Sequence, residues 1–90
     1  MKPIFENIKL AVAEDDDELR NLIHNYLASY NMNIHSCKNG TELLSLIFDN
    51  AEDTFKPDII LTDLRMPGLN GMEFLRITHG INQIPPIILM

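Results

Sequence analysis

Short apolar runs alternate along this chain with segments in which apolar residues recur at helical spacing. Such runs suit buried strands, and such spacing suits helices that pack on a sheet. The expected strands are residues 8–13, 34–37, 59–61 and 87–90, and the expected helices include residues 19–27, 43–48 and 72–79. Strands that alternate with helices form a parallel sheet with right-handed crossovers. We therefore expect an α/β fold, a doubly wound parallel sheet in the order β-α-β-α-β-α-β.

Residues that favour helix ends lie at the ends of the expected helices. Asp16 or Asp17 can cap the first helix, because a carboxylate oxygen there accepts hydrogen bonds from the first turn. Thr41 is expected to cap the second helix and Asn70 the third, and Gly80 is expected to end the third. The expected apolar face of the second helix comprises Leu43, Leu44, Ile47 and Phe48.

Composition predicts one small globular domain, residues 1–90, with 46% hydrophobic and 22% charged residues. The formal net charge of −6 repels nucleic-acid phosphates, so we expect no direct nucleic-acid binding. No apolar run approaches the ~20 residues that a membrane helix needs, so we expect no membrane association. Cys37 is the only cysteine and cannot form an internal disulfide, which fits a reducing compartment. Together these features predict a cytoplasmic domain.

Acidic residues follow two of the expected strands. Glu14 and Asp15 open the stretch EDDD after the first strand, and Asp63 follows the third. Taken alone, EDDD is better interpreted as a solvated helix start, and Asp63 as a turn-forming residue. Open parallel sheets, however, bind ligands at the carboxyl ends of their strands, and there the three carboxylates converge if the two strands are neighbours. Close carboxylates repel one another, and a hard divalent cation such as Mg²⁺ would relieve that repulsion.

Two stretches, AVAEDDDELR and PDIILTDLRMPGLNGMEFLR, resemble the receiver domain of bacterial two-component response regulators. The second is the more specific. It combines an apolar strand, Asp63, a proline four residues further on, a glycine eight residues further on and an amphipathic helix. The resemblance implies that this proline and glycine, Pro67 and Gly71, shape the loop over the site. It spans nearly the whole chain and implies the flavodoxin-like (βα)5 receiver fold.

The same resemblance implies a role for each site residue. Asp63 matches the phosphoacceptor, whose carboxylate takes a phosphoryl group from a histidine kinase or a phosphotransfer protein. Asp15 matches a direct ligand of Mg²⁺ or Mn²⁺, and Glu14 matches an acidic partner that holds the ion largely through water. Arg65 matches the position whose backbone carbonyl completes the metal ligands. The implied function is a phosphorylation switch in signal transduction, not an enzyme that turns over a substrate.

The family pattern continues beyond Met90, where the expected fourth strand ends. A hydroxyl residue after that strand, a fifth strand with a phosphate-pairing lysine and two further helices have no match in this sequence. We therefore expect a receiver domain that is incomplete at its C-terminus. Two functions stay open: a phosphoacceptor, or a phosphorylation-incompetent remnant that serves as a protein interaction module. The apolar edge PPIILM is also a template for self-association by strand pairing.

Overall fold

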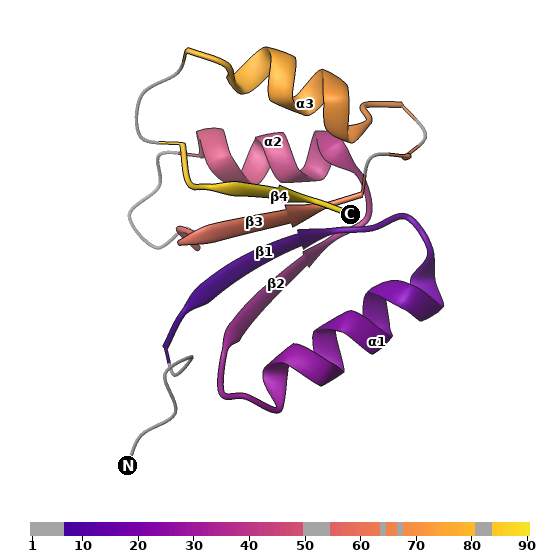
Figure 1. The fold of residues 1–90 in the computed structure, drawn as a ribbon, viewed down its shortest axis with the longest axis vertical. Coiled ribbons are helices and arrows are strands. Elements are labelled where there is room, and N and C mark those ends of the chain that lie inside the picture. The colour runs from indigo at the N-terminus through magenta and orange to yellow at the C-terminus, as the bar shows by residue number, and fades with distance from the viewer. Residues whose placement is uncertain (1–6, 50–54, 64, 67, 81–83) are drawn as a thin grey trace.

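The helices and strands follow the alternation of the sequence. The computed structural model describes residues 7–49, 55–63, 65–66, 68–80 and 84–90. In chain order the elements are β1 (Lys9–Ala13), α1 (Asp17–Ala28), β2 (Asn33–Cys37), α2 (Gly40–Phe48), β3 (Ile59–Thr62), α3 (Gly71–Thr78) and β4 (Ile87–Leu89). This order confirms the expected α/β fold (Figure 1).

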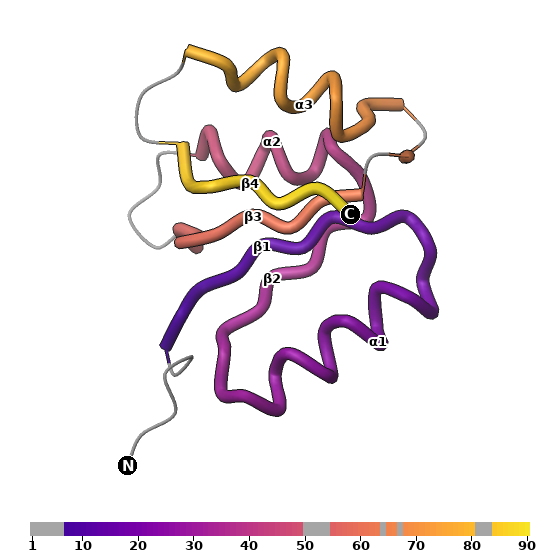
Figure 2. The backbone as a smooth tube through the Cα atoms, in the orientation of Figure 1, coloured from indigo at the N-terminus to yellow at the C-terminus, as the bar shows by residue number. Residues whose placement is uncertain are grey.

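The four strands form one parallel sheet in the order β2-β1-β3-β4. β1 therefore lies between β2 and β3, with its last residue, Ala13, paired with Cys37 on one side and with Thr62 on the other. Because the strands are parallel, their carboxyl ends share one edge of the sheet (Figure 2). The residues that follow β1 and β3 are thus neighbours, which meets the condition under which the acidic residues were expected to converge.

Helices lie on both faces of the sheet, α1 on one face and α2 with α3 on the other (Figure 1). The buried core joins the sheet to α2 and α3, and it includes Phe74, Leu43 and Ile60, each 0% exposed. Burying each such side chain contributes about 1.5–3 kcal/mol. In contrast, α1 has no buried residue, and its Leu22 and Tyr26 are 64% and 62% exposed. The apolar stripe of α1 therefore forms a helix as expected but remains largely at the surface.

The predicted helix caps are right for two helices and wrong for one. The side chain of Asp16 accepts a hydrogen bond from the backbone of Leu19 at 3.0 Å, and that of Asn70 caps α3 in the same way. Thr41 does not cap α2. Asn39 does, accepting from the backbone N–H of Glu42 at 2.8 Å. Asn39 has the extended backbone of a cap residue, so the helix begins before Thr41 is reached.

Helix α2 also buries a slightly different face from the expected one. Leu43 is fully buried, but Leu46 is buried where Phe48 was expected, and Phe48 is 46% exposed. Phe48 is the last residue of the helix, and the chain leaves it in extended conformation at Asp49. Gly80 ends α3 as expected, with a positive φ of 83°. Each strand differs from its expected range by one residue at one end, as boundaries commonly do.

In the described ranges, no helix combines the length and the apolar character that crossing a bilayer requires.

Candidate functional site

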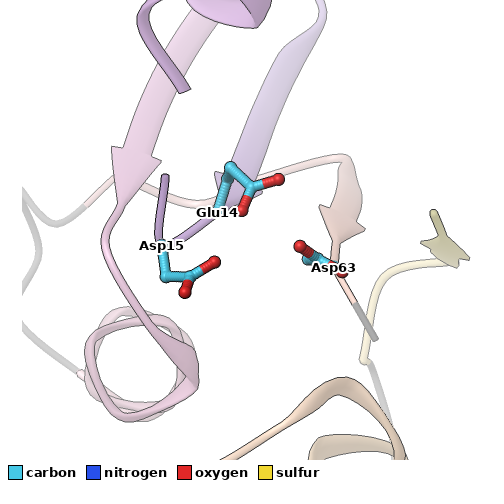
Figure 3. Close-up of side chains that lie close together, drawn as sticks. All are labelled: Glu14, Asp15 and Asp63. Carbon is cyan, nitrogen blue, oxygen red and sulfur yellow. The ribbon is translucent and has the colours of Figure 1, made fainter. Parts of the chain in front are cut away.

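Backbone hydrogen bonds fix the residues that follow β1 and β3. The N–H of Glu14 donates to the carbonyl of Cys37 at 3.1 Å, and the N–H of Asp63 donates to the carbonyl of Ala13 at 3.1 Å. The ladder of the sheet thus continues one residue past each strand. Figure 3 shows the result, in which the side chains of Glu14, Asp15 and Asp63 gather at one edge of the sheet.

The three acidic side chains form a compact cluster. One carboxylate oxygen from each of Glu14, Asp15 and Asp63 lies within 4.8 Å of the others. Glu14 is 2% exposed, whereas Asp15 is exposed and Asp63 is half-buried. Mg²⁺ holds its ligands at about 2.1 Å, so two oxygens on opposite sides of the ion lie about 4.2 Å apart. The cluster is only slightly wider than this, so its size and its oxygen ligands fit a hard divalent cation.

The pKa of Glu14 is raised in this cluster. Burial raises the pKa of the Glu14 carboxyl from 4.5 to about 7, because its charged form loses contact with water. The N–H of Asp16 donates to Glu14 Oε2 at 3.2 Å and acts in the opposite direction. The neighbouring carboxyls of Asp15 and Asp63 raise the pKa further. A positive charge in the cluster would favour the ionised form of Glu14.

Asp63 is held by the turn that follows it. The backbone N–H of Arg65 donates to Asp63 Oδ1 at 2.9 Å, which is the hydrogen bond of an Asx turn. Asp63 is therefore a turn residue and also a member of the acidic cluster. The role of the Arg65 carbonyl stays a prediction.

The loop after this turn contains two residues for which the family resemblance implied a shaping role. Pro67 lies outside the described residues. Gly71 is buried and is the first residue of α3, and its role in shaping the loop stays a prediction. In the described part of the loop, the glycine with left-handed backbone is Gly68, with φ of 78°. Such a conformation suits glycine, which has no Cβ atom.

Arg20 is the last residue of the stretch AVAEDDDELR, and it contacts the residue that opens the acidic cluster. Its guanidinium donates to the backbone carbonyl of Glu14 at 3.0 Å and pairs with Asp17 at 2.5 Å. Arg20 thereby ties the first turn of α1 to the residue that opens the acidic cluster. The signal for the ion pair was present in DDDELR, because residues three apart on a helix are neighbours. The contact to the Glu14 carbonyl depends on how the chain turns between β1 and α1, which no spacing reveals.

Two apolar hollows of about 400 and 410 Å³ lie beside α1. Tyr26 and Leu27 line both, and none of the three acidic residues lines either. The acidic cluster is therefore separate from these two hollows.

Comparison with known proteins identifies one family. Residues 10–90 match the response regulator receiver domain. The regulatory protein VanRB of Enterococcus faecalis is 28% identical over 83 residues, which are 92% of this chain and 36% of that protein. The 3′,5′-cyclic-nucleotide phosphodiesterase regA of Dictyostelium discoideum is 33% identical over 92% of this chain and 10% of its own length. The chain thus spans little more than a third of VanRB and a tenth of regA.

Solved structures agree with this match. The receiver domain of the Francisella response regulator 1452 superposes with a TM-score of 0.81 at 30% identity, over 92% of this chain and 64% of that one. The response regulator TrrA, solved in complex with the histidine kinase ThkA, superposes with a TM-score of 0.77 at 26% identity. That superposition covers 91% of this chain and 66% of the other.

Proposed function

Because the chain belongs to the response regulator receiver domain family of two-component systems, we propose that Asp63 accepts a phosphoryl group from a histidine kinase or a phosphotransfer protein, and that this step switches the conformation of the domain. The observation that carries the proposal is the place of Asp63. It lies half-buried at the carboxyl end of β3, within 4.8 Å of two further carboxylates. The complex of TrrA with ThkA supports a histidine kinase as the donor.

The reaction requires a positioned carboxylate and a place for negative charge. An oxygen of Asp63 attacks the phosphorus of a phosphohistidine, and the new O–P bond forms as the N–P bond breaks. The electron pair of the broken bond leaves with the imidazole of the donor. The hydrogen bond from the Arg65 N–H to Asp63 Oδ1, at 2.9 Å, limits rotation of the carboxylate before the attack. Most of the catalysis in such transfers is positioning and electrostatic stabilisation.

Glu14, Asp15 and Asp63 are the side chains that would hold Mg²⁺, or Mn²⁺, together with the backbone carbonyl of Arg65. When bound, the cation neutralises charge on the transferring phosphoryl group. The acidic residues themselves place negative charge next to Asp63, which hinders the approach of a phosphoryl donor. Phosphoryl transfer to Asp63 is therefore expected to require a divalent cation. Binding of that cation can be followed directly, because Mg²⁺ at millimolar concentration should perturb the amide resonances of Asp15 and Asp63.

A phosphorylation assay tests the proposed function. The chain is incubated with acetyl phosphate and Mg²⁺, and intact-mass spectrometry counts the phosphoryl groups. We expect at most one labelled site, lost in Asp63→Asn and in the presence of a chelator. Asp58→Asn is a matched control, since Asp58 is exposed and precedes the same strand at its other end. Labelling that survives Asp63→Asn would show that another residue is the acceptor.

The same assay separates the alternative function. A folded chain that binds Mg²⁺ but accepts no phosphoryl group from acetyl phosphate or a phosphorylated kinase is an interaction module without phosphotransfer.

Under the proposed function the domain is modified itself and does not turn over a substrate. It acts in the cytoplasm, and its net charge of −6 disfavours direct binding to nucleic acid.

We also propose that the polypeptide of residues 1–90 self-associates along β4. β4 is an edge strand of the described sheet, and Ile88 and Met90 at this edge are 52% and 43% exposed. Residues 87–90 include no charged side chain, so no charge on this strand opposes its pairing with another chain. Light scattering at micromolar concentration should detect a dimer or larger species, and Ile88→Lys should shift it toward the monomer. A monodisperse wild-type monomer would contradict the proposal.

A further inference from the structure

The start of α2 touches the loop that leads from Asp63 to α3. A Cβ atom built on Gly40 would lie 2.4 Å from the carbonyl oxygen of Leu69, and 3.2 Å from both the carbonyl carbon and the Cβ of Leu69. A distance of 2.4 Å is far inside van der Waals contact. The nearest atom belongs to the backbone, so no change of side-chain rotamer relieves the overlap. Position 40 therefore tolerates only a glycine while the loop stays where it is.

The α2 side of this contact is held firmly. Asn39 accepts from the backbone N–H of Glu42 at 2.8 Å, and Glu42 accepts in return from the backbone N–H of Lys38 at 3.0 Å. In the next turn Leu43 is fully buried in the core. Two hydrogen bonds and a buried side chain thus anchor the start of α2. We therefore expect a side chain added at Gly40 to displace the loop rather than the helix.

The loop side carries the acceptor. Within the described residues, the chain leaves Asp63 through the turn closed by the Arg65 N–H and buries Met66 in the core. It then reaches Leu69, directly before the residue that caps α3. Besides the burial of Met66, the contact of Leu69 with Gly40 also joins this loop to the rest of the domain. We expect a displacement of Leu69 to act toward Asp63 in one direction and toward the start of α3 in the other.

We propose that Gly40 is a positioning residue for the Asp63 site. Because it has no side chain, the backbone at Leu69 lies against α2, and this contact holds the loop in the position from which Asp63 and Arg65 would hold a cation. The inference rests on the proposed function for its metal and phosphoryl readouts. The displacement of the loop can be measured without either. The residue acts through the loop and touches neither the cation nor the phosphoryl group.

Gly40→Ala tests the proposal, with Thr41→Ala as the matched control. Thr41 is the next residue of the same helix and is exposed. Without metal, we expect the amide resonances of Asp63 and Arg65 to shift in Gly40→Ala but not in Thr41→Ala. With metal, we expect Mg²⁺ to bind at least about tenfold more weakly to Gly40→Ala, as is typical when a partner that orients the ligands is lost. Labelling by acetyl phosphate should slow as well.

Helix propensity alone predicts the opposite result. Alanine is a better helix former than glycine, so Gly40→Ala would be harmless or stabilising if Gly40 had no role in placing the loop. Unshifted Asp63 and Arg65 amides in Gly40→Ala would overturn the proposal, whether or not the wild-type chain binds Mg²⁺. Wild-type protein that neither binds Mg²⁺ nor becomes labelled would instead contradict the proposed function.

A second variant covers the case in which Gly40→Ala does not fold. One glycine inserted between Gly68 and Leu69 lengthens the loop and lets its backbone move away from position 40. In the Gly40→Ala background, we expect this insertion to restore folding while Mg²⁺ binding stays weaker than in the wild type. If the insertion does not restore folding, the overlap with Leu69 is not the cause of the defect, and the proposal is wrong.

Discussion

The buried carboxyl of Glu14 should make the stability of the metal-free domain depend on pH in a defined direction. Its pKa is raised to about 7 in the folded state, against 4.5 for an unperturbed glutamate, chiefly by burial. Below the unfolded pKa both states carry the proton, and the stability linked to it is fully present. As pH rises from about 4.5 to about 7, the unfolded state loses the proton while the folded state retains it, so the free energy of unfolding falls.

The size of this effect follows from the two pKa values. One pKa unit corresponds to ~1.36 kcal/mol, so the full difference is worth about 3 kcal/mol. About 2.5 kcal/mol of it is lost between about pH 5 and about pH 8. Glu14→Gln keeps the size of the side chain but removes the titration, and this variant should gain about 2.5 kcal/mol relative to wild type between those two pH values.

Urea denaturation at the two pH values, in the presence of a chelator, measures the effect. The decisive quantity is the difference between wild type and Glu14→Gln, because other groups also titrate in this range. Glu18→Gln is the control, since Glu18 is an exposed glutamate in the first turn of α1. Mg²⁺ should flatten the pH dependence of the wild type by favouring the ionised form of Glu14. Identical pH dependence in wild type and Glu14→Gln would refute the claim that the raised pKa of Glu14 lowers the free energy of unfolding as pH rises.

Three further changes test the packing, the capping and the cluster. Asn39→Ala removes the cap of α2 and should lower the free energy of unfolding by about 1 kcal/mol, measured by urea denaturation. Phe74→Ala leaves a cavity where the ring is 0% exposed and should cost about 3–5 kcal/mol; a loss below that of Asn39→Ala would contradict the described core. Mg²⁺ at about 100 times its Kd should raise the free energy of unfolding by about 2.7 kcal/mol. Thermal scans should show this gain, and Asp15→Asn should abolish most of it.

Much of the fold was predictable because its signals are local. The apolar runs and the helical spacing between them predicted each described strand and helix. Most of the observed ends lie within one residue of the expected ones. Asp16 or Asp17, and Asn70, were predicted as caps because they lie just before periodic segments, and the structure selects Asp16 for the first helix. Thr41 was wrong because Asn39, two residues earlier, also favours a cap, and the backbone chooses between them.

The candidate site was predictable in part. The topology brings Glu14, Asp15 and Asp63 together at one edge. The sequence predicted this only on the condition that the first and third strands are neighbours, which the structure meets. The burial of Glu14 was not predictable, because EDDD has the composition of a solvated helix start. Nor could spacing reveal that Gly40 touches Leu69, since the two residues lie in different segments and meet only when α2 and the loop pack together.

The order of strands also constrains how the molecule folds. β1 pairs with β2 through the short connection that contains α1, so this pair closes a small loop and can form early. The pairing of β1 with β3 closes a much longer loop, and it is this second pairing that brings Asp63 to Glu14 and Asp15. The acidic cluster therefore forms only when the non-local pairing of β1 with β3 is complete. A cation that binds it would act chiefly by slowing the separation of β1 from β3, so we expect Mg²⁺ to lower the unfolding rate and to leave the refolding rate nearly unchanged.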